Sequence, residues 1–395
     1  MFSLVRHGTV LSLAILILGG CSQIAQSPQA AQDERNLGHP DSVLLWNPAQ
    51  QLASFRNFDR IFDTRTIPAG DHPSALPERL RDLSQVSYQV EGETFDLQGF
   101  KEHNYVVGLL AIKDGEIVLE QYDRGNTAAT KWISNSVAKS VVSMLVGAAI
   151  RDGYITSVDD SVTTYLPLLR GTSYEGVTIR DALRMSSGVA WNEDYEDPES
   201  DVSHEIGLTA LERLRYLGNQ PRVAAPGERF NYSTGETHLV GGVLRSAIGN
   251  NLSTYLSLKI WRPFGMESDA NWMLVEPGGA EHGGSGISAT LRDYGRIGLF
   301  ALSGGVLPDG SHVLPDGWME ESTTGSPSNE GYGYLWWLSD GGVYRALGIF
   351  GQAISVDPGE NLVIVTHSVW PDAMGQQYSA HRDAFFDALT QALRD

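Results

Sequence analysis

The sequence predicts an α/β (α+β) protein in which a central antiparallel sheet is flanked by helices and packs against a helical lobe. Residues 105–122 contain two apolar, β-rich segments around Asp114-Gly115, a pair favoured in tight turns, and this pattern predicts a β-hairpin. Residues 348–368 repeat the pattern around Asp357-Pro358-Gly359, and the patterns between the two hairpins are mainly helical. We therefore expect both hairpins to share one sheet, with a site in the cleft between sheet and lobe.

The predicted helices differ in how much of their surface is apolar. The helix in "SNSVAKSVVSMLVGAAIRDGY" begins at Ser136 and is apolar nearly all round, which predicts a buried core helix. The C-terminal helix, about Ser379 to Leu393, carries two phenylalanines and two leucines on one face and is amphipathic. Thr178 is a candidate N-cap of a short helix. The other helical patterns cover residues 178–189, 206–219 and 235–250.

The composition bounds the size of the protein and the kind of partner it has. The chain has 395 residues, of which 42% are hydrophobic, and this is enough for one large domain or two modest ones. The formal net charge is −20. Such acidity argues against nucleic acid and against anionic membrane surfaces as partners.

The N-terminus has the layout of a secretory signal. Arg6 and His7 precede the apolar run from Val10 to Leu18, which is too short to span a bilayer. The run ends in "LGGCS", where Cys21 is the only cysteine of the chain. This segment resembles a bacterial lipoprotein signal, and the alternative is an ordinary signal cleavage site.

The lipoprotein resemblance implies an anchor and a location. Residues 1–20 would be removed, and the thiol of Cys21 would carry a diacylglycerol group that binds the membrane. We then expect residues 21–45, which are polar and lack periodicity, to form a flexible tether, and residues 46–395 to form the folded domain. The protein would lie in the bacterial cell envelope, on the periplasmic face. Ser22 after the cysteine leans toward the outer membrane.

Ser136 and Lys139 are the candidate catalytic pair. Residues three apart share one face of a helix, and a buried ammonium is costly unless something uses it. A serine hydroxyl needs an adjacent base, and a lysine can be that base when burial lowers its pKa. The amide of Ser136 also lies at a helix N-terminus, where it can stabilise an oxyanion. Among the five lysines, only Lys139 has a serine three positions before it.

Two further positions complete the candidate site. Tyr232, in "PGERFNYSTGETHLVGGVLR", lies between a turn and a helix start, where it could relay a proton to the leaving group; the alternative is a packing tyrosine. In "RALGIFGQAISVDP", Gly348 lets the backbone approach closely, and the amide of Ile349 could be the second oxyanion donor. The alternative there is a plain bulge in a sheet.

Six motifs together resemble one enzyme superfamily: "SVAKS", "MSSGVAWNEDYEDP", "PGERFNYST", "GGSGISATLRDYGRIG", "GYGYLWW" and "ALGIFGQAISVDP". From about Trp46 onward the chain resembles the serine β-lactamases and penicillin-binding proteins. Within that superfamily it is most similar to the class C-related hydrolases and esterases, especially the 6-aminohexanoate-oligomer hydrolases. The resemblance implies a β-lactamase/transpeptidase-like fold and these roles: nucleophile Ser136, base Lys139, relay Tyr232, oxyanion amides Ser136 and Ile349, and a substrate-side tyrosine, Tyr195.

Two departures from the superfamily pattern bear on specificity. Thr234 stands where the Tyr-x-Asn motif has its asparagine, and Ala346-Leu347-Gly348 replaces Lys-Thr-Gly. Losing a charge-assisted contact to a substrate carboxylate removes about 1.5–3 kcal/mol. Efficient β-lactam hydrolysis is therefore disfavoured, and a neutral or apolar acyl group is favoured. The backbone role of Gly348 in substrate binding is retained.

The expected function is a serine hydrolase that cleaves an ester or linear amide of a small molecule through an acyl-enzyme, similar to 6-aminohexanoate-dimer hydrolase, without metal or cofactor. The first alternative is a β-lactamase or D-Ala-D-Ala carboxypeptidase. A Ser-His-Asp hydrolase built on His282–Ser288 is another, although Ile287 stands where Gly-x-Ser-x-Gly needs its last glycine. A non-catalytic, lipid-anchored cell-envelope binding protein is the alternative of a different class. Scattered histidines argue against a metal site, and Trp191, Trp336 and Trp337 suggest an aromatic-walled cleft.

Overall fold

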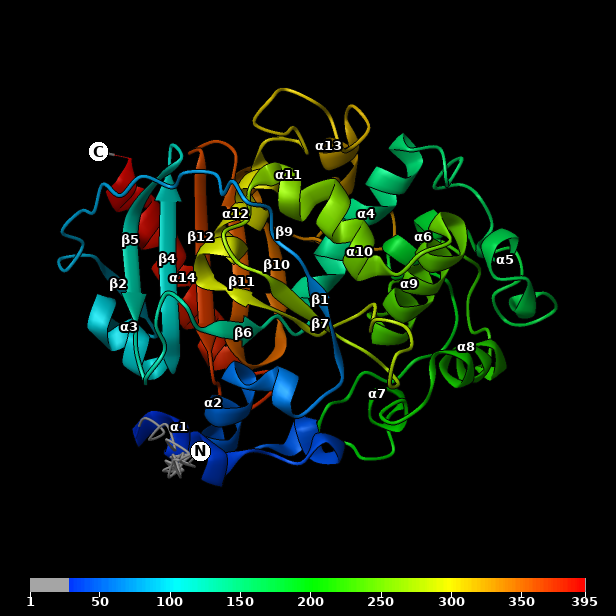
Figure 1. Ribbon diagram of the computed structural model, residues 1–395, viewed down its shortest axis with the longest axis horizontal. Coiled ribbons are helices and arrows are strands. Elements are labelled where there is room, and N and C mark those ends of the chain that lie inside the picture. Colours follow the sequence, from blue (N-terminus) through cyan, green and yellow to red (C-terminus); the bar gives the residue numbers. More distant parts are fainter. Residues whose placement is uncertain (1–27, 395) are drawn as a thin grey trace, which may run out of the picture.

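The computed structural model describes residues 28–394, and its centre is a six-stranded antiparallel sheet (Figure 1). The strand order is β5-β4-β12-β11-β10-β9. Leu110 of β4 pairs with Val365 of β12, so the two predicted hairpins share one sheet, as expected. The six strands are β4 (Val106–Lys113), β5 (Glu116–Tyr122), β9 (Trp337–Leu338), β10 (Tyr344–Gly348), β11 (Gln352–Asp357) and β12 (Leu362–Ser368).

The tight turn between β4 and β5 has the predicted chemistry. Asp114 has φ 54° and Gly115 has φ 81°. Two positive φ values in succession are the requirement of the hairpin turn that matches the twist of antiparallel strands, and they explain the Asp-Gly pair.

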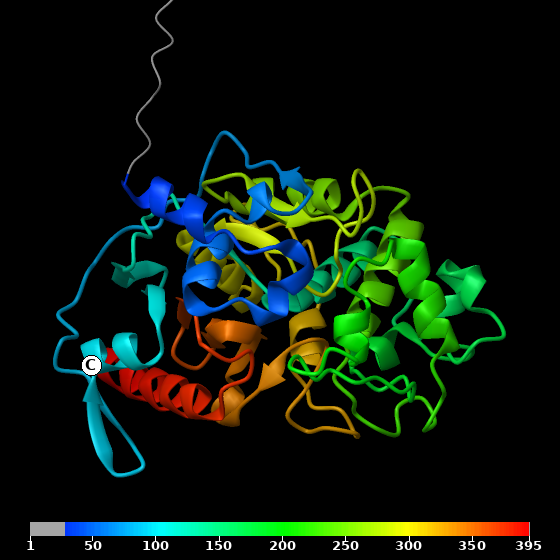
Figure 2. The same cartoon turned by 90° about the horizontal axis from the view of Figure 1, so that it is seen from below.

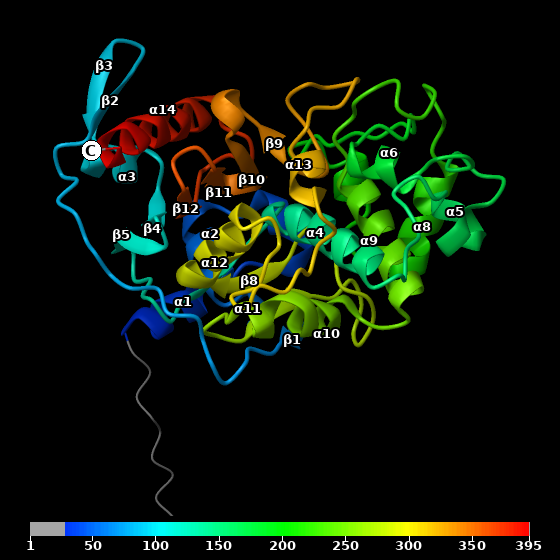
Figure 3. The same ribbon diagram turned by 90° about the horizontal axis from the view of Figure 1, so that it is seen from above.

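Helices cover both faces of the central sheet. Figure 3 shows the sheet between α14 (Gln376–Leu393) on one side and α12 (Leu291–Leu302) on the other. On the α14 side, Phe385 stacks on Phe100 of α3 (Leu97–His103), with ring centroids 4.0 Å apart. The predicted C-terminal helix is therefore confirmed, and its apolar face is buried against the sheet.

The helical lobe lies beside the sheet, on the right of Figure 1. The predicted helix at Thr178 is confirmed but is only five residues long, with a capping box in which Asp181 N donates to Thr178 Oγ1 at 3.1 Å and Thr178 N donates to the Asp181 carboxylate at 2.9 Å. The helices of this lobe and its edges are α4 (Val137–Arg151), α5 (Val162–Tyr165), α6 (Ile179–Leu183), α7 (Asp201–His204), α8 (Ala210–Asn219), α9 (Thr234–Ile248), α10 (Leu252–Leu256), α11 (Arg262–Phe264) and α13 (Trp318–Ser322).

Two smaller sheets were not foreseen from sequence patterns. One has the order β1-β7-β8-β6, and the other pairs β2 with β3. Their strands are only three or four residues long, too short for a recognisable alternation. They are β1 (Thr64–Ile67), β2 (Ser87–Val90), β3 (Glu93–Asp96), β6 (Lys131–Ile133), β7 (Ala270–Met273) and β8 (Ile287–Thr290). The first of these sheets matters for the site, because β6 ends three residues before Ser136.

The tether predicted for residues 21–45 is wrong for residues 28–45. These form α1 (Pro28–Asn36) and the 3₁₀ segment η1 (Pro40–Leu45), which precede α2 (Pro48–Arg56) and η2 (Phe58–Arg60). Side-chain hydrogen bonds hold the polar segment on α2: Gly38 N donates to Ser54 Oγ at 2.8 Å, and Asn57 donates to the Asp33 carboxylate at 3.1 Å. Figure 2 shows this segment lying over the middle of the molecule.

The predicted signal peptide and Cys21 lie outside the described residues. Within residues 28–394, none of the helices combines the length and apolar character needed to cross a bilayer.

Candidate active site

Ser136 lies at the start of the buried helix α4, directly after a strained turn. Asn135 has φ 44°, a conformation that asparagine tolerates better than most residues. Its side chain donates to the carbonyl of Ile349 at 3.0 Å, which ties the turn to the end of β10. Ser136 is the N-cap position of α4, although its hydroxyl makes no capping hydrogen bond. The hydroxyl is therefore available for other partners, and its amide lies at the positive end of the helix dipole.

Lys139 lies one helical turn further on and is 1% exposed. Its Nζ donates to Ser136 Oγ at 2.9 Å, to Thr234 Oγ1 at 2.9 Å and to the carbonyl of Gly284 at 3.0 Å. Burial lowers the pKa of Lys139 to about 8, against the opposing effect of the Glu193 and Glu205 carboxylates. The ammonium is thus held by three acceptors, yet it can lose a proton near neutral pH.

Tyr232 lies beside this pair. The Nζ of Lys139 is 5.1 Å from the centroid of the Tyr232 ring. The Trp337 ring also stacks on the Tyr232 ring, with centroids 5.6 Å apart. Burial, followed by the Glu193 carboxylate, raises the pKa of Tyr232 above its ordinary value. The structure therefore brings together the serine, lysine and tyrosine that the sequence singled out.

Gly348 brings the end of β10 against the amide of Ser136. A Cβ on Gly348 would lie 2.6 Å from the Ser134 carbonyl oxygen and 3.1 Å from Ser136 N. Ile349 follows Gly348 and lines the same cavity as Ser136. The close approach that the sequence predicted at Gly348 is confirmed. The amide of Ile349 lies on the segment that could complete an oxyanion hole.

Glu193 and Thr234 form a second layer of the site that sequence reasoning missed. Thr234 accepts from Lys139 and donates to the Glu193 carboxylate through its hydroxyl, and its amide donates to the same carboxylate at 2.9 Å. Tyr195 donates to Glu193 at 2.6 Å, and the Trp191 indole is a fourth donor. Thr234 therefore does more than replace an asparagine: it links the lysine to a negative charge. The signal was present in "NEDYEDP", of which only the tyrosine was singled out.

A cavity of about 330 Å³ opens beside Ser136. Tyr195, Thr234 and Ile349 line it, as do apolar side chains from residues 40–62 and from the end of β7. The three tryptophans expected to wall the cleft are not among its lining residues. Trp191 instead holds Glu193, Trp337 supports Tyr232, and Trp336 is buried edge-on against Tyr344.

Comparison with known protein families shows which family this chain belongs to. The profile of the Beta-lactamase family matches residues 97–384, a stretch that includes Ser136, Lys139 and Tyr232. The chain belongs to the beta-lactamase family. It is a hydrolase with the β-lactamase fold, and its Ser-x-x-Lys motif lies at the start of the buried helix, as the apolar sequence pattern predicted.

One relative and two solved structures show what the chain is similar to. The 6-aminohexanoate-dimer hydrolase of Paenarthrobacter ureafaciens is 29% identical over 301 residues, covering 70% of this chain and 76% of that protein. A Bacillus anthracis protein assigned to the 6-aminohexanoate-dimer hydrolases superposes with a TM-score of 0.79 at 21% identity, covering 87% of this chain and 95% of that one. A penicillin-binding protein from Bacillus halodurans gives a TM-score of 0.60 at 17% identity, covering 74% and 99%.

A buried charged cluster lines part of the active-site cavity of this beta-lactamase family member. Arg213 pairs with Glu205 at 3.0 Å and lies 2.9 Å from His282 Nε2, while Gly284 N donates to His282 Nδ1 at 3.2 Å. Both ring nitrogens of His282 are thus engaged away from any serine hydroxyl, which argues against a Ser-His-Asp arrangement. Within residues 28–394 no group of three His, Cys, Asp or Glu side chains could hold a metal ion.

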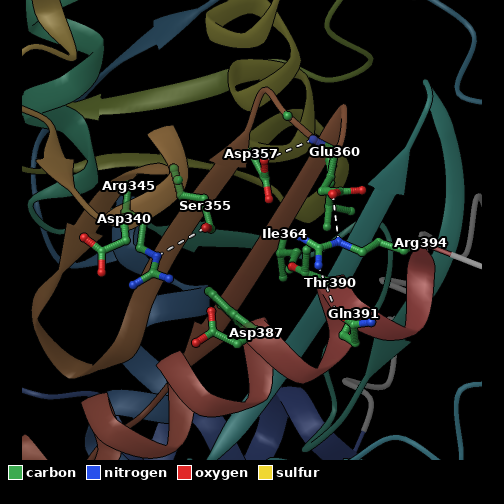
Figure 4. A pocket seen from close by; sticks show the side chains of 15 residues that line it. Asp340, Arg345, Ser355, Asp357, Glu360, Ile364, Asp387, Thr390, Gln391 and Arg394 are labelled. Atoms are coloured by element: carbon green, nitrogen blue, oxygen red, sulfur yellow. Dashed lines mark hydrogen bonds and ion pairs between the residues drawn. The ribbon is translucent and has the colours of Figure 1, made fainter.

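A second cavity, of about 340 Å³, lies on the α14 side of the central sheet. Figure 4 shows it between β10–β12 and the last turns of α14. Its two arginines are paired with carboxylates: Arg345 with Asp383 at 3.1 Å and Arg394 with Glu360 at 2.8 Å. None of the predicted site residues lines it, so we assign the active site to the cavity beside Ser136.

Proposed function

We propose that the protein is a serine hydrolase that cleaves an ester or linear amide bond through an acyl-enzyme intermediate. The observation that carries this proposal is the buried contact of 2.9 Å between Lys139 Nζ and Ser136 Oγ. Burial lowers the pKa of Lys139 to about 8, so the lysine has a neutral form that can accept the serine proton near neutral pH.

The reaction has two halves. In the first, Ser136 Oγ attacks the substrate carbonyl while neutral Lys139 takes its proton, and the amides of Ser136 and Ile349 stabilise the oxyanion. Collapse of the tetrahedral intermediate breaks the ester or amide bond. Lys139 passes the proton through Tyr232 to the departing alcohol or amine. In the second half, water attacks the acyl-enzyme, again with Lys139 as base, and releases the acid.

Two observations support the substrate class: the name of a similar protein and the residues that replace Lys-Thr-Gly. The curated relative is a 6-aminohexanoate-dimer hydrolase by name, which supports a linear amide as substrate. The positions of Lys-Thr-Gly hold Ala346 and Leu347 before Gly348, and neither can pair with a substrate carboxylate. We therefore expect esters and linear amides to be cleaved at least tenfold more efficiently than benzylpenicillin, measured as kcat/KM.

The test combines active-site labelling with turnover. Wild type, Ser136→Ala and Lys139→Ala are treated with a fluorophosphonate probe and assayed with p-nitrophenyl butyrate. Ser285→Ala is the matched control, because Ser285 also lines the cavity, whereas the Nζ of Lys139 donates to Ser136, Thr234 and the Gly284 carbonyl and not to the Ser285 hydroxyl. Probe labelling and ester turnover should both vanish in Ser136→Ala and Lys139→Ala, and both should persist in Ser285→Ala. A wild type that neither labels nor turns over any ester would instead favour the non-catalytic binding protein.

We also propose an envelope location, carried by the sequence of the N-terminus. Lipidation at Cys21 would place the hydrolase on the periplasmic face of a bacterial membrane, on the outer membrane if Ser22 is read as a sorting signal. Metabolic labelling with an alkyne fatty acid tests this: wild type should be labelled, and Cys21→Ala should not.

A further inference from the structure

The cavity beside Ser136 has one wall built by the N-terminal part of the chain. Val43 and Leu44 from η1 line it, together with Phe58, Ile61 and Phe62. We call residues 40–62 the N-terminal wall. The wall lies before residue 97, where the match to the beta-lactamase family begins. In Figure 2 the segment, in blue, lies over the middle of the molecule.

Aromatic contacts pack the N-terminal wall against two segments of the active site, the strand β6 that leads to Ser136 and the residue Phe350 that follows Ile349. Phe55 is 1% exposed and contacts Trp132 of β6 edge-on, with ring centroids 5.6 Å apart. The same ring contacts Phe350 at 5.7 Å, and Phe58 stacks on Phe62 at 4.5 Å. Because β6 leads to Ser136 and Phe350 follows the second proposed oxyanion amide, the wall packs on the two segments that would hold the reacting carbonyl. It is part of the packed core and can act as a fixed template.

The position of Tyr232 decides which part of a substrate enters this cavity. Tyr232 is the proposed proton relay to the leaving group, and it stacks on Trp337 outside the set of residues that line the cavity. The leaving group must therefore point toward Tyr232. The acyl group, attached to Ser136 on the other side of the carbonyl, points along the cavity and the N-terminal wall.

The charges around the cavity disfavour a negative acyl group. Asp41 of the N-terminal wall and Asp63, which directly follows the wall, are exposed residues that line the cavity. Among the described residues that line the cavity, the basic ones are Arg213 and the buried His282. The guanidinium of Arg213 already pairs with the Glu205 carboxylate at 3.0 Å. A carboxylate on the acyl chain would meet like charges and find no free cation.

We propose that the N-terminal wall forms an acyl-chain pocket, and that the preferred substrates are esters or amides of neutral, medium-length aliphatic acids. This inference rests on the proposed function, because it assumes transfer of the acyl group to Ser136. Leu44 and Phe62 are then specificity-determining residues. Each buried methylene of the acyl chain should raise kcat/KM by about fourfold.

The test is a chain-length series of p-nitrophenyl esters, from acetate to octanoate, on the full-length protein. In wild type, kcat/KM should rise at least tenfold from acetate to hexanoate. Leu44→Trp should fill the pocket and abolish this rise, measured as the ratio of kcat/KM for hexanoate to kcat/KM for acetate within the same variant, and fluorophosphonate labelling checks that its active site has folded. Leu45→Trp is the matched control, because Leu45 is 69% exposed and does not line the cavity. In the adipate monoester a carboxylate replaces the terminal methyl group of the hexanoate chain, and its kcat/KM should be at least tenfold lower than that of the hexanoate ester.

Three results would overturn the acyl-chain pocket: a flat chain-length profile in wild type, an unchanged profile in Leu44→Trp, or equal turnover of adipate and hexanoate. If Leu44→Trp loses labelling because it misfolds, Phe62→Ala decides instead. Within this variant the gain in kcat/KM per methylene, measured from acetate to hexanoate, should be lower than in wild type, and an unchanged gain contradicts the proposal. Absence of both labelling and acetate turnover in wild type is a different outcome, which removes the proposed function itself and this inference with it.

Discussion

Gly348 lies so close to the amide of Ser136 that no side chain fits between them. A Cβ on Gly348 would stand 3.1 Å from Ser136 N and 2.6 Å from the Ser134 carbonyl oxygen, and real Cβ atoms essentially never come within 3.0 Å of another heavy atom in this way. The end of β10 and the start of α4 can therefore approach only with glycine at 348. The proposed oxyanion hole depends on this approach.

Gly348→Ala should lower kcat for p-nitrophenyl butyrate by at least about 10²-fold, because the Ile349 amide is displaced from the carbonyl oxygen. The measurement is steady-state kinetics. Gly242→Ala is the control: its Cβ would lie 3.5 Å from Leu166 in ordinary contact, and alanine suits the interior of α9. That variant should keep wild-type activity. Activity of Gly348→Ala within threefold of wild type would rule out the proposed oxyanion geometry.

The activity should depend on pH through Lys139. Its folded-state pKa is about 8, and only the neutral amine is a base. Below pH 7, kcat/KM should therefore rise about tenfold per pH unit and level off above pH 8. The pH–rate profile measures this directly. A profile that is flat from pH 5 to 9 would mean that another group accepts the serine proton.

Glu193→Gln should move the rising, acidic limb of this pH–rate profile to lower pH. The Glu193 carboxylate raises the pKa of Lys139, so the neutral amide lets that pKa fall further and leaves more free amine at a given pH. The pH at which kcat/KM reaches half of its maximum is the readout. The maximum itself will also drop, because the substitution alters the hydrogen bonds to Thr234. Glu196→Gln, an exposed carboxylate of the same loop, should leave the profile unchanged. An unmoved limb in Glu193→Gln would show that its charge does not reach the base.

Phe55→Ala should lower the free energy of unfolding by about 3–5 kcal/mol, the usual cost of removing a buried phenylalanine side chain. The reason is that Phe55 joins α2 to Trp132 and Phe350. Urea denaturation measures the change. Leu45→Ala, at an exposed position, should stay within about 0.5 kcal/mol of wild type. A small effect of Phe55→Ala would mean that the N-terminal wall is not part of the folded core.

Local patterns predicted the parts of this protein whose geometry is set within one turn or one helix. Ser136 and Lys139 are three residues apart on one helix, so their contact follows from helical geometry once the helix is recognised. The Asp114-Gly115 turn and the Thr178 cap are likewise encoded by neighbouring residues. The shared sheet of the two hairpins required only that both apolar patterns be buried together.

Long-range polar contacts could not be predicted in this way. Residues 28–45 are polar and carry no periodicity, yet they fold because hydrogen bonds such as Gly38 to Ser54 and packing around Phe55 hold them. The link from Lys139 through Thr234 to Glu193 joins three separate segments, and no spacing in the chain reveals it. From the sequence, Thr234 could therefore be interpreted only as a replacement of the motif's asparagine, although its hydroxyl accepts a hydrogen bond from Lys139.

The central claim is that Ser136 carries the acyl group during turnover. The most direct measurement is mass spectrometry of acid-quenched enzyme during hydrolysis of p-nitrophenyl butyrate, followed by peptide mapping of the adduct. We predict a butyryl ester on Ser136 in wild type and in Ser285→Ala, and no adduct in Ser136→Ala. A butyryl group on any other residue, or an adduct that persists in Ser136→Ala, would contradict the account.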